Sequence, residues 1–152
     1  MPDYHADTFS LTVPSGWRDA TLHLFLAPPM DDFQPSVVLQ RRPAGEGDQA
    51  SALADAAVGG LQGALTNFKL IRRKDVDVRG RAAHVILYSW EDGQKRSLVQ
   101  WQTFLVGAGV AHVLTATCLE SQVSQFEPVM ISIMKSMEPI EQGLGEKLPP
   151  AG

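Results

Sequence analysis

Apolar and polar residues alternate along much of this chain, and an alternation with a period of two is typical of β-strands. In the first third it predicts short strands at residues 8–13, 21–27 and 36–42, the last entered through a proline-rich loop. Four longer strands are predicted further along, at residues 68–80, 81–91, 96–107 and 109–118. Glycines mark the breaks between them, as tight hairpins require, so we expect these four strands to form an antiparallel meander.

Two segments have apolar residues at helical spacing instead. The first, residues 49–68, carries an apolar stripe from Leu53 to Leu65, with Asp48 as a candidate N-cap. The second, residues 121–138, carries a similar stripe. Three glycines interrupt the first helix, and each lowers its stability by up to about 1 kcal/mol relative to alanine. Either another backbone approaches this helix closely or the helix is simply loose.

The order of elements is three strands, a helix, four strands and a helix. This order predicts an α+β fold, an antiparallel six- or seven-stranded sheet with two helices packed on one face. A chain of 152 residues is long enough for one domain with its own core. We therefore expect a single domain over residues 1–140, followed by a glycine- and proline-rich disordered tail at residues 141–152.

The predicted sheet is apolar on both faces, although a sheet with helices on one face only should be polar on the other. The strand at residues 21–27 has three leucines on one face and Phe25 on the other, and both alternate sets along residues 97–106 contain large apolar side chains. We expect an exposed apolar patch, which marks an interaction site. Its members are Leu22, Leu24, Leu26, Val38 and Phe104. A homodimer interface and a hydrophobic client both stay open as its occupant.

Three neutral glutamines accompany this patch, namely Gln40, Gln100 and Gln102. An amide both donates and accepts hydrogen bonds. These side chains therefore suit a groove for apolar helices that also expose serines, threonines or backbone carbonyls. On the residues alone, the alternative that the glutamines simply face water stays open.

The charge balance and the absence of motifs argue against several classes of function. A formal net charge of −4 disfavours nucleic acid or an anionic membrane surface as the main partner. The single cysteine, Cys118, allows no internal disulfide and is interpreted as a small buried hydrophobe, with a reactive thiol as the alternative. The four histidines have no metal-binding spacing, and no nucleophile motif or phosphate-binding loop occurs. We expect no metal, no cofactor and no enzymatic activity.

The N-terminal residues show neither the basic region nor the apolar core of a secretory signal. The longest apolar stretch, residues 104–116, is broken by glycines and is too short to cross a bilayer. We expect a soluble, cytoplasmic protein.

Segments spread over nearly the whole chain, from Phe9 to Met137, add a further indication. They are FSLTVPSGWRDATLHLF, PSVVLQRR, LTNFKLI, VRGRAAHVILYSW, QWQTFLV, HVLTATC and FEPVMISIMKSM. The strongest part is the opening segment, with Pro14, Trp17, Asp19, Thr21 and Phe25. Together these segments resemble the DcrB-like family, and within it the chain is most similar to the effector-associated (Eag) chaperones of type VI secretion.

The resemblance implies a PsbP-like α+β fold and a homodimer shaped as a claw. Its apolar groove would hold transmembrane helices from the N-terminal region of a toxic effector that also carries a PAAR domain. The chaperone would keep those helices soluble in the cytoplasm until export, without catalysis. Members of the DcrB branch are envelope lipoproteins, and the missing signal and lipidation cysteine favour the cytoplasmic branch.

Carried over position by position, the resemblance places Leu22, Leu24 and Val38 in the groove, with Gln102 as a polar contact. It also implies a glutamine on the first helix, for which Gln62 is the candidate. The expected client-binding residues are Leu22, Leu24, Val38, Gln40, Gln62, Gln100, Gln102 and Phe104. The alternative functions are a non-catalytic PsbP-like scaffold for a protein complex and a carrier of a small hydrophobic ligand.

Overall fold

A computed structural model of the protein describes residues 3–5, 10–30, 33–45, 48–107 and 109–139. The predicted disordered tail, residues 141–152, lies outside the described residues. The strands are β1 (Asp3–His5), β2 (Ser10–Thr12), β3 (Leu22–Leu26), β4 (Ser36–Pro43), β5 (Thr66–Val78), β6 (Arg81–Glu91), β7 (Ser97–Gly107) and β8 (Val110–Leu119). The helices are α1 (Ala50–Ala64), the short 3-10 helix η1 (Glu120–Gln122) and α2 (Val123–Lys135).

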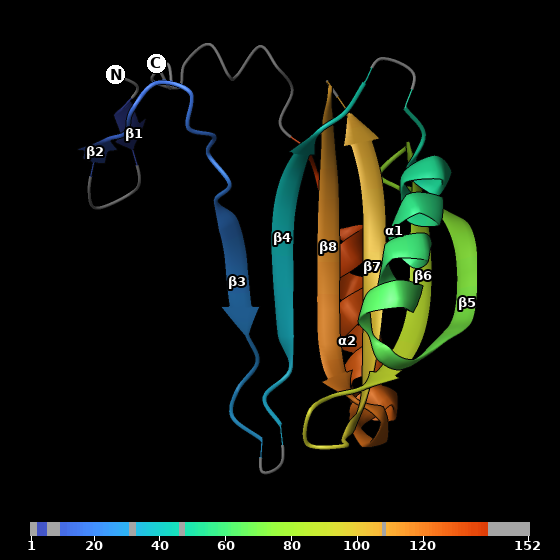
Figure 1. The fold of residues 1–152 in the computed structure, drawn as a ribbon. Helices are drawn as coiled ribbons and strands as arrows, with labels where there is room; N and C mark the ends of the chain where they lie inside the picture. Colours follow the sequence, from blue (N-terminus) through green and yellow to red (C-terminus); the bar gives the residue numbers. More distant parts are fainter. Residues whose placement is uncertain (1–2, 6–9, 31–32, 46–47, 108, 140–152) are drawn as a thin grey trace.

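Six strands form one antiparallel sheet in the order β3-β4-β8-β7-β6-β5 (Figure 1). The four strands from β5 to β8 make the predicted meander, and β4 joins it at β8. The first predicted strand does not enter this sheet, since β2 pairs with β1 in a separate two-stranded sheet. The α+β class with a six-stranded antiparallel sheet and two helices is thus confirmed.

The two helices lie on opposite faces of the sheet, which corrects the prediction that both pack on one face (Figure 1). On β7, Trp101 and Leu105 belong to the core beneath α2, whereas Phe104 belongs to the core beneath α1. The physical reason is the apolar character of both strand faces. Each face has to be shielded from water, and one helix is available for each.

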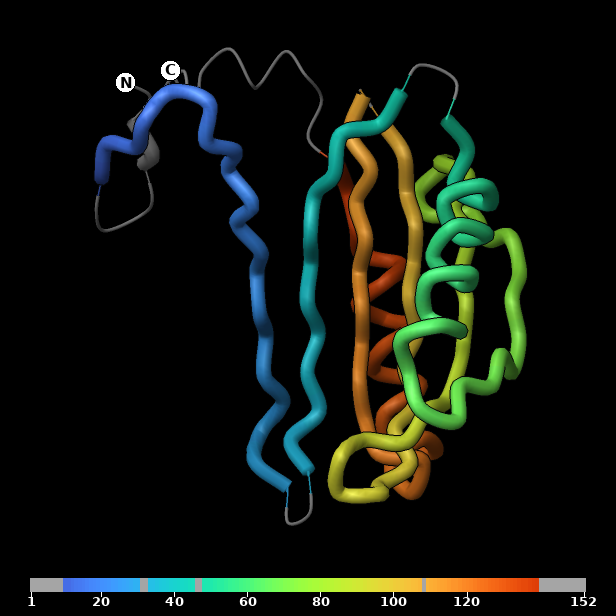
Figure 2. The backbone as a smooth tube through the Cα atoms, viewed as in Figure 1, coloured from blue at the N-terminus to red at the C-terminus, as the bar shows by residue number. Residues whose placement is uncertain are grey.

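Helix α1 covers only part of its face. It contacts β5, β6 and β7, and the sheet continues past it through β8 and β4 to β3 (Figure 2). The core beneath α1 confirms this partial cover, because it contains Ile86 and Tyr88 of β6 but no residue of β3 or β4. The sheet therefore leaves an uncovered strip beside α1, on the side of β3.

Cys118 lies in β8 with its side chain fully buried in the core beneath α2. Burial raises the pKa of this thiol to about 12, and the charge of Glu127 acts in the same direction. The thiol is therefore protonated at neutral pH, and only a thiolate is an effective nucleophile. The reading of Cys118 as a small buried hydrophobe fits this environment, and a reactive thiol does not.

We expect the native protein to be unreactive toward the thiol reagent DTNB at pH 8 and to release one equivalent of product after unfolding in guanidinium chloride, because Cys118 is the single thiol. The measurement is the absorbance of the released thiolate over time. Modification of the native protein at the rate of a free small thiol would contradict the buried position.

Candidate functional site

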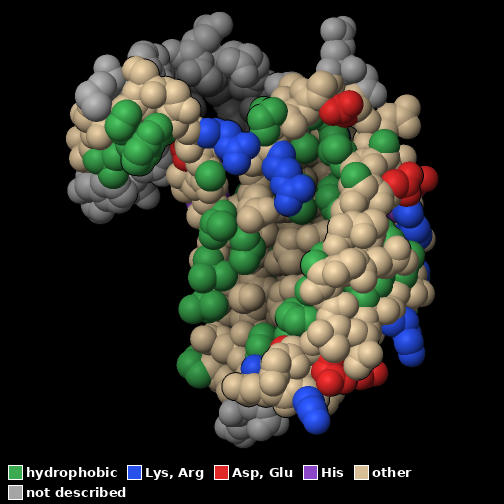
Figure 3. Space-filling model, viewed as in Figure 1, with side chains coloured by type: hydrophobic (Ala, Val, Ile, Leu, Met, Phe, Trp, Pro, Cys, Tyr) green, Lys and Arg blue, Asp and Glu red, His purple; other side chains and the backbone are tan. Residues whose placement is uncertain are grey.

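The strip beside α1 forms a groove whose residues are brought onto one face by the strand register. Leu24 pairs with Val38, Val38 with Thr115, and Thr115 with Gln102, so all four side chains point the same way. Figure 3 shows the resulting hollow between the apolar side chains of β3 and the outer surface of α1. The groove is lined by Leu22, Leu24, Leu26, Val38, Gln40, Gln100, Gln102, Thr115 and Thr117.

The β3 side of the groove is a row of exposed leucines. Leu22, Leu24 and Leu26 are 46%, 55% and 59% exposed. Full burial of a leucine is worth about 1.5–3 kcal/mol relative to exposure, so this row forgoes several kcal/mol of stability in the isolated chain. A patch of this kind marks an interaction site.

The floor of the groove is polar but uncharged. Trp90 Nε1 donates to Gln100 Oε1 at 3.1 Å, and Gln100 Nε2 donates to Thr117 Oγ1 at 2.9 Å. Gln102 Nε2 donates to Thr115 Oγ1 at 3.3 Å, whereas Gln102 Oε1 has no partner among the described residues. These amides are bonded across strands rather than simply directed to water, and Gln102 keeps one buried acceptor without a partner among the described residues.

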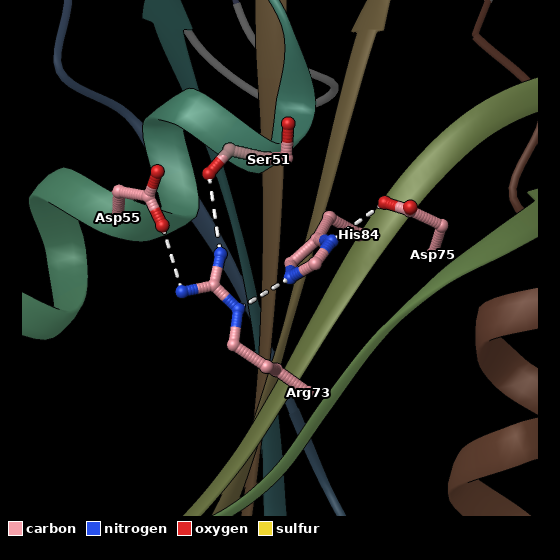
Figure 4. Close-up of polar contacts among 5 residues, drawn as sticks. All are labelled: Ser51, Asp55, Arg73, Asp75 and His84. Carbon is pink, nitrogen blue, oxygen red and sulfur yellow. Dashed lines mark hydrogen bonds and ion pairs between the residues drawn. The ribbon is translucent and has the colours of Figure 1, made fainter.

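The α1 side of the groove is tied to the sheet by a polar network (Figure 4). Arg73 Nη1, on β5, lies 2.7 Å from Asp55 Oδ1, and Arg73 Nη2 donates to the Ser51 carbonyl oxygen at 3.4 Å. Its Nε also donates to His84 Nε2 at 3.0 Å. Because that nitrogen accepts, the proton of the neutral imidazole is on Nδ1, which donates to Asp75 at 2.7 Å. The network holds α1 over β5 and β6 and so keeps the strip beside it open.

Six of the eight predicted site residues lie together in the groove, and two do not. Phe104 is on the correct face but is 1% exposed beneath α1, so it supports the wall and does not line the hollow. Gln62 follows Asp55 by seven residues, nearly two helical turns, and therefore lies on the β5 side of α1, away from the groove. The six residues in the groove are Leu22, Leu24, Val38, Gln40, Gln100 and Gln102.

Sequence reasoning missed the contributions of β8 and α1. Thr115 and Thr117 became visible only through the β8 register. On α1, Gly60 and Ala64 lie on the side opposite Asp55, toward the groove. A Cβ atom added at Gly60 would meet nothing within 4 Å, so no contact inside the described chain requires a glycine there. The glycines that interrupt this helix are visible in the sequence, but the sequence alone does not show which side of the helix faces the groove.

The opposite side of β3 also faces a hollow. Phe25 is 59% exposed and borders a cavity of about 520 Å³ between β3, the β3–β4 connection and α2. Val129 and Ile133 of α2 line the same cavity. Strand β3 is therefore accessible on both of its faces, and its second face carries the apolar Phe25 beside His23.

Comparison with known proteins places this geometry among relatives. The family model described as DcrB matches residues 9–136. The Pseudomonas aeruginosa (strain PAO1) protein named Effector EagT6 is 26% identical over 142 residues, which covers 91% of this chain and 96% of the relative. A solved structure of PA94, a Pseudomonas aeruginosa protein of unknown function, is 24% identical, covers 92% of this chain and 97% of that chain, and superposes with a TM-score of 0.74.

Two more distant structures share the fold alone. LpqN of Mycobacterium tuberculosis, described as involved in cell envelope biogenesis, gives a TM-score of 0.53 at 15% identity and covers 84% of this chain and 87% of that chain. Cyanobacterial PsbP from Synechocystis gives 0.56 at 9% identity and covers 86% and 99%. The predicted PsbP-like fold is thus confirmed. Among the described helices, none is long and apolar enough to cross a membrane.

We expect Arg73→Ala to lower the free energy of unfolding by about 1–3 kcal/mol, because it removes the ion pair and two hydrogen bonds and leaves His84 Nε2 without its donor. The measurement is urea unfolding, together with faster amide hydrogen exchange in α1. The control is Arg72→Ala, whose exposed ion pair with Glu127 is worth less than about 1 kcal/mol. Equal effects of the two variants would contradict an anchoring role for Arg73.

Proposed function

The chain belongs to the DcrB family, and from this premise we propose that it is a cytoplasmic, non-catalytic chaperone for a type VI secretion effector. It binds the N-terminal transmembrane helices of an effector that carries a PAAR domain and shields them in the groove before export. The relative named Effector EagT6 supports the association with an effector. The groove beside α1, with its apolar edge and uncharged floor, is the observation that carries the proposal.

The dimensions of the groove suit one transmembrane helix. Strands β3, β4 and β8 lie side by side, which at about 4.8 Å between neighbours gives a width near the 10–12 Å diameter of a helix. Strand β4 has 8 residues and spans about 26 Å at about 3.3 Å per residue. A membrane-spanning helix of about 20 residues is about 30 Å long, so most of its length finds a floor.

The chemistry of the floor suits a helix taken from a membrane. Such helices present serine and threonine hydroxyls to one another, and these need partners once lipid and neighbouring helices are gone. Gln102 Oε1 is buried and has no partner among the described residues, so a rotation of this amide would let it accept a hydrogen bond from a client hydroxyl. Because the glutamines and threonines are neutral, no charge has to be stripped of water when an apolar helix covers them.

The α1 side suits close packing of a second helix. Gly60 and Ala64 are one turn apart on the groove side, and small residues at this spacing let two helical backbones approach. This gives the glycine a purpose that the chain's own packing does not supply. Close approach of another backbone, rather than a loose helix, thus accounts for the glycine at position 60.

A homodimer completes the proposal. Strand β3 is an edge strand of five residues, all exposed, and it carries no lysine, arginine, aspartate or glutamate to discourage pairing. Strand β5 at the other edge is guarded by charged residues and by two irregularities in its register. A second copy at the β3 end would extend the apolar surface beyond one groove and cover Phe25.

We expect Leu24→Asp to weaken binding of a synthetic 20-residue leucine–alanine helix by more than about tenfold, because a carboxylate replaces about 1.5–3 kcal/mol of apolar contact. Binding is measured by the fluorescence of a dansyl group on the peptide. His23→Asp is the matched control, since it adds the same group to the opposite side of β3. If Leu24→Asp keeps the circular dichroism spectrum of the wild type and binds the peptide equally well, that result would contradict the groove assignment.

Gly60→Ala should raise the free energy of unfolding by about 0.5–1 kcal/mol, since alanine is the better helix former and the site has room for a methyl group. The same variant should bind the leucine–alanine helix more weakly, because the methyl group keeps the backbones apart. Gly59→Ala is the control: it also has room but lies on the side of Asp55, so it should stabilise without loss of binding. Equal affinities of the two variants would argue against close packing on α1.

A further inference from the structure

One end of the groove carries a positive charge that the proposed apolar client does not explain. Among the groove-facing positions of β3, β4, β7 and β8, only Arg42 is charged. It follows Gln40 on the same face of β4 and pairs with Ala111 of β8. Figure 3 shows basic side chains at the upper end of the hollow, where the apolar row of β3 begins.

At this end the groove opens into a cavity of about 840 Å³ between residues 18–21 and the end of β4. Its lining contains Arg18, Arg41 and Arg42 against one acidic residue, Asp19, which leaves two positive charges. The whole chain has a net charge of −4, so the charge of this cavity is opposite in sign to that of the chain.

The arginines in this cavity are not equally engaged. Asp19 Oδ2 lies 3.9 Å from Arg41 Nη2. Hydrogen bonds from Thr21 hold the pKa of the Asp19 carboxyl below its usual range, so Asp19 is ionised at neutral pH and interacts with Thr21 and Arg41. Arg18 and Arg42 form no side-chain ion pair with the residues that the structure describes. Two guanidinium groups are therefore available to an incoming anion.

The direction of α1 strengthens the same polarity. Six residues separate the end of β4 at Pro43 from the start of α1 at Ala50, so the N-terminus of α1 lies at the Arg42 end of the groove (Figure 1). Its first turn has no acidic residue, and the carboxylate of the preceding Asp48 accepts from the Gly45 amide instead. The partial positive charge of a helix N-terminus thus adds to that of the arginines.

We propose that the bound helix lies antiparallel to α1, with its C-terminal end at Arg42, and that acidic residues just after that helix enter the cavity between Arg18 and Arg42. This inference rests on the proposed function and deepens it. The C-terminus of a helix carries a partial negative charge, which complements this end of the groove. The opposite orientation would set two positive helix ends and two arginines against one another.

Two synthetic peptides test the orientation with the full-length chain. Both have the same 20-residue core of leucine, alanine and serine and a nitroxide label at the C-terminus, and they end in either Asp-Asp or Asn-Asn. The nitroxide should broaden the amide signals of Gln40 and Val110, at the Arg42 end. Broadening of Leu26 and Thr117, at the far end, or of both ends equally, would overturn the orientation.

Affinity tests the acidic flank. The Asp-Asp peptide should bind about two- to fivefold more tightly than the Asn-Asn peptide at low ionic strength, and the difference should vanish in 1 M NaCl. Arg42→Gln should remove the difference, whereas Arg79→Gln, at an exposed arginine paired with Glu138, should keep it. Equal affinities for the wild-type chain, or an Arg42→Gln variant that still discriminates, would overturn the acidic flank. Failure of both peptides to bind would instead remove the proposed function, and this inference with it.

Discussion

The structure depends on a mismatch between the area of a sheet and the area that one helix can cover. Two helices are available for a six-stranded sheet that is apolar on both faces, and they lie on opposite faces. A helix about 10–12 Å across covers two to three strands spaced about 4.8 Å apart. Helix α1 lies over β5, β6 and β7. The strip formed by β8, β4 and β3 on the same face is therefore exposed to water in the isolated chain.

The groove follows from where α1 is held. The contacts of Arg73 with Asp55, the Ser51 carbonyl and His84 keep α1 at the β5 side of the sheet. The end of the groove near Leu26 is kept in place at Phe33, where Gln122 donates to the Phe33 carbonyl oxygen and the Arg96 guanidinium lies over the Phe33 ring. With the α1 side and this end anchored, the hollow is present in the isolated chain, and a preformed site lowers the ordering cost of binding.

The two edge strands of the sheet, β3 and β5, differ in composition and in regularity. Strand β5 carries basic and acidic side chains and two irregularities, devices that discourage edge pairing. Strand β3 has none of these and exposes large apolar side chains on both faces. A protein that leaves one edge unguarded and the other protected directs its partners to a single side, and both the proposed client and the proposed second copy meet it there.

Period and turn signals alone determined the α+β class, the meander from β5 to β8 and the surplus of apolar residues, because these are local properties of neighbouring residues. Alternation within one strand also placed Leu22 and Leu24 on one face, whereas Val38 was added by the resemblance to a known family, because its place beside them depends on the pairing of two strands. Only the tertiary structure decided that the helices take opposite faces, that Phe104 is buried beneath α1 and that Gln62 turns away from the groove. Those outcomes depend on which strand neighbours which and on where Arg73 holds α1, and such long-range pairings leave no periodic trace in the order of residues.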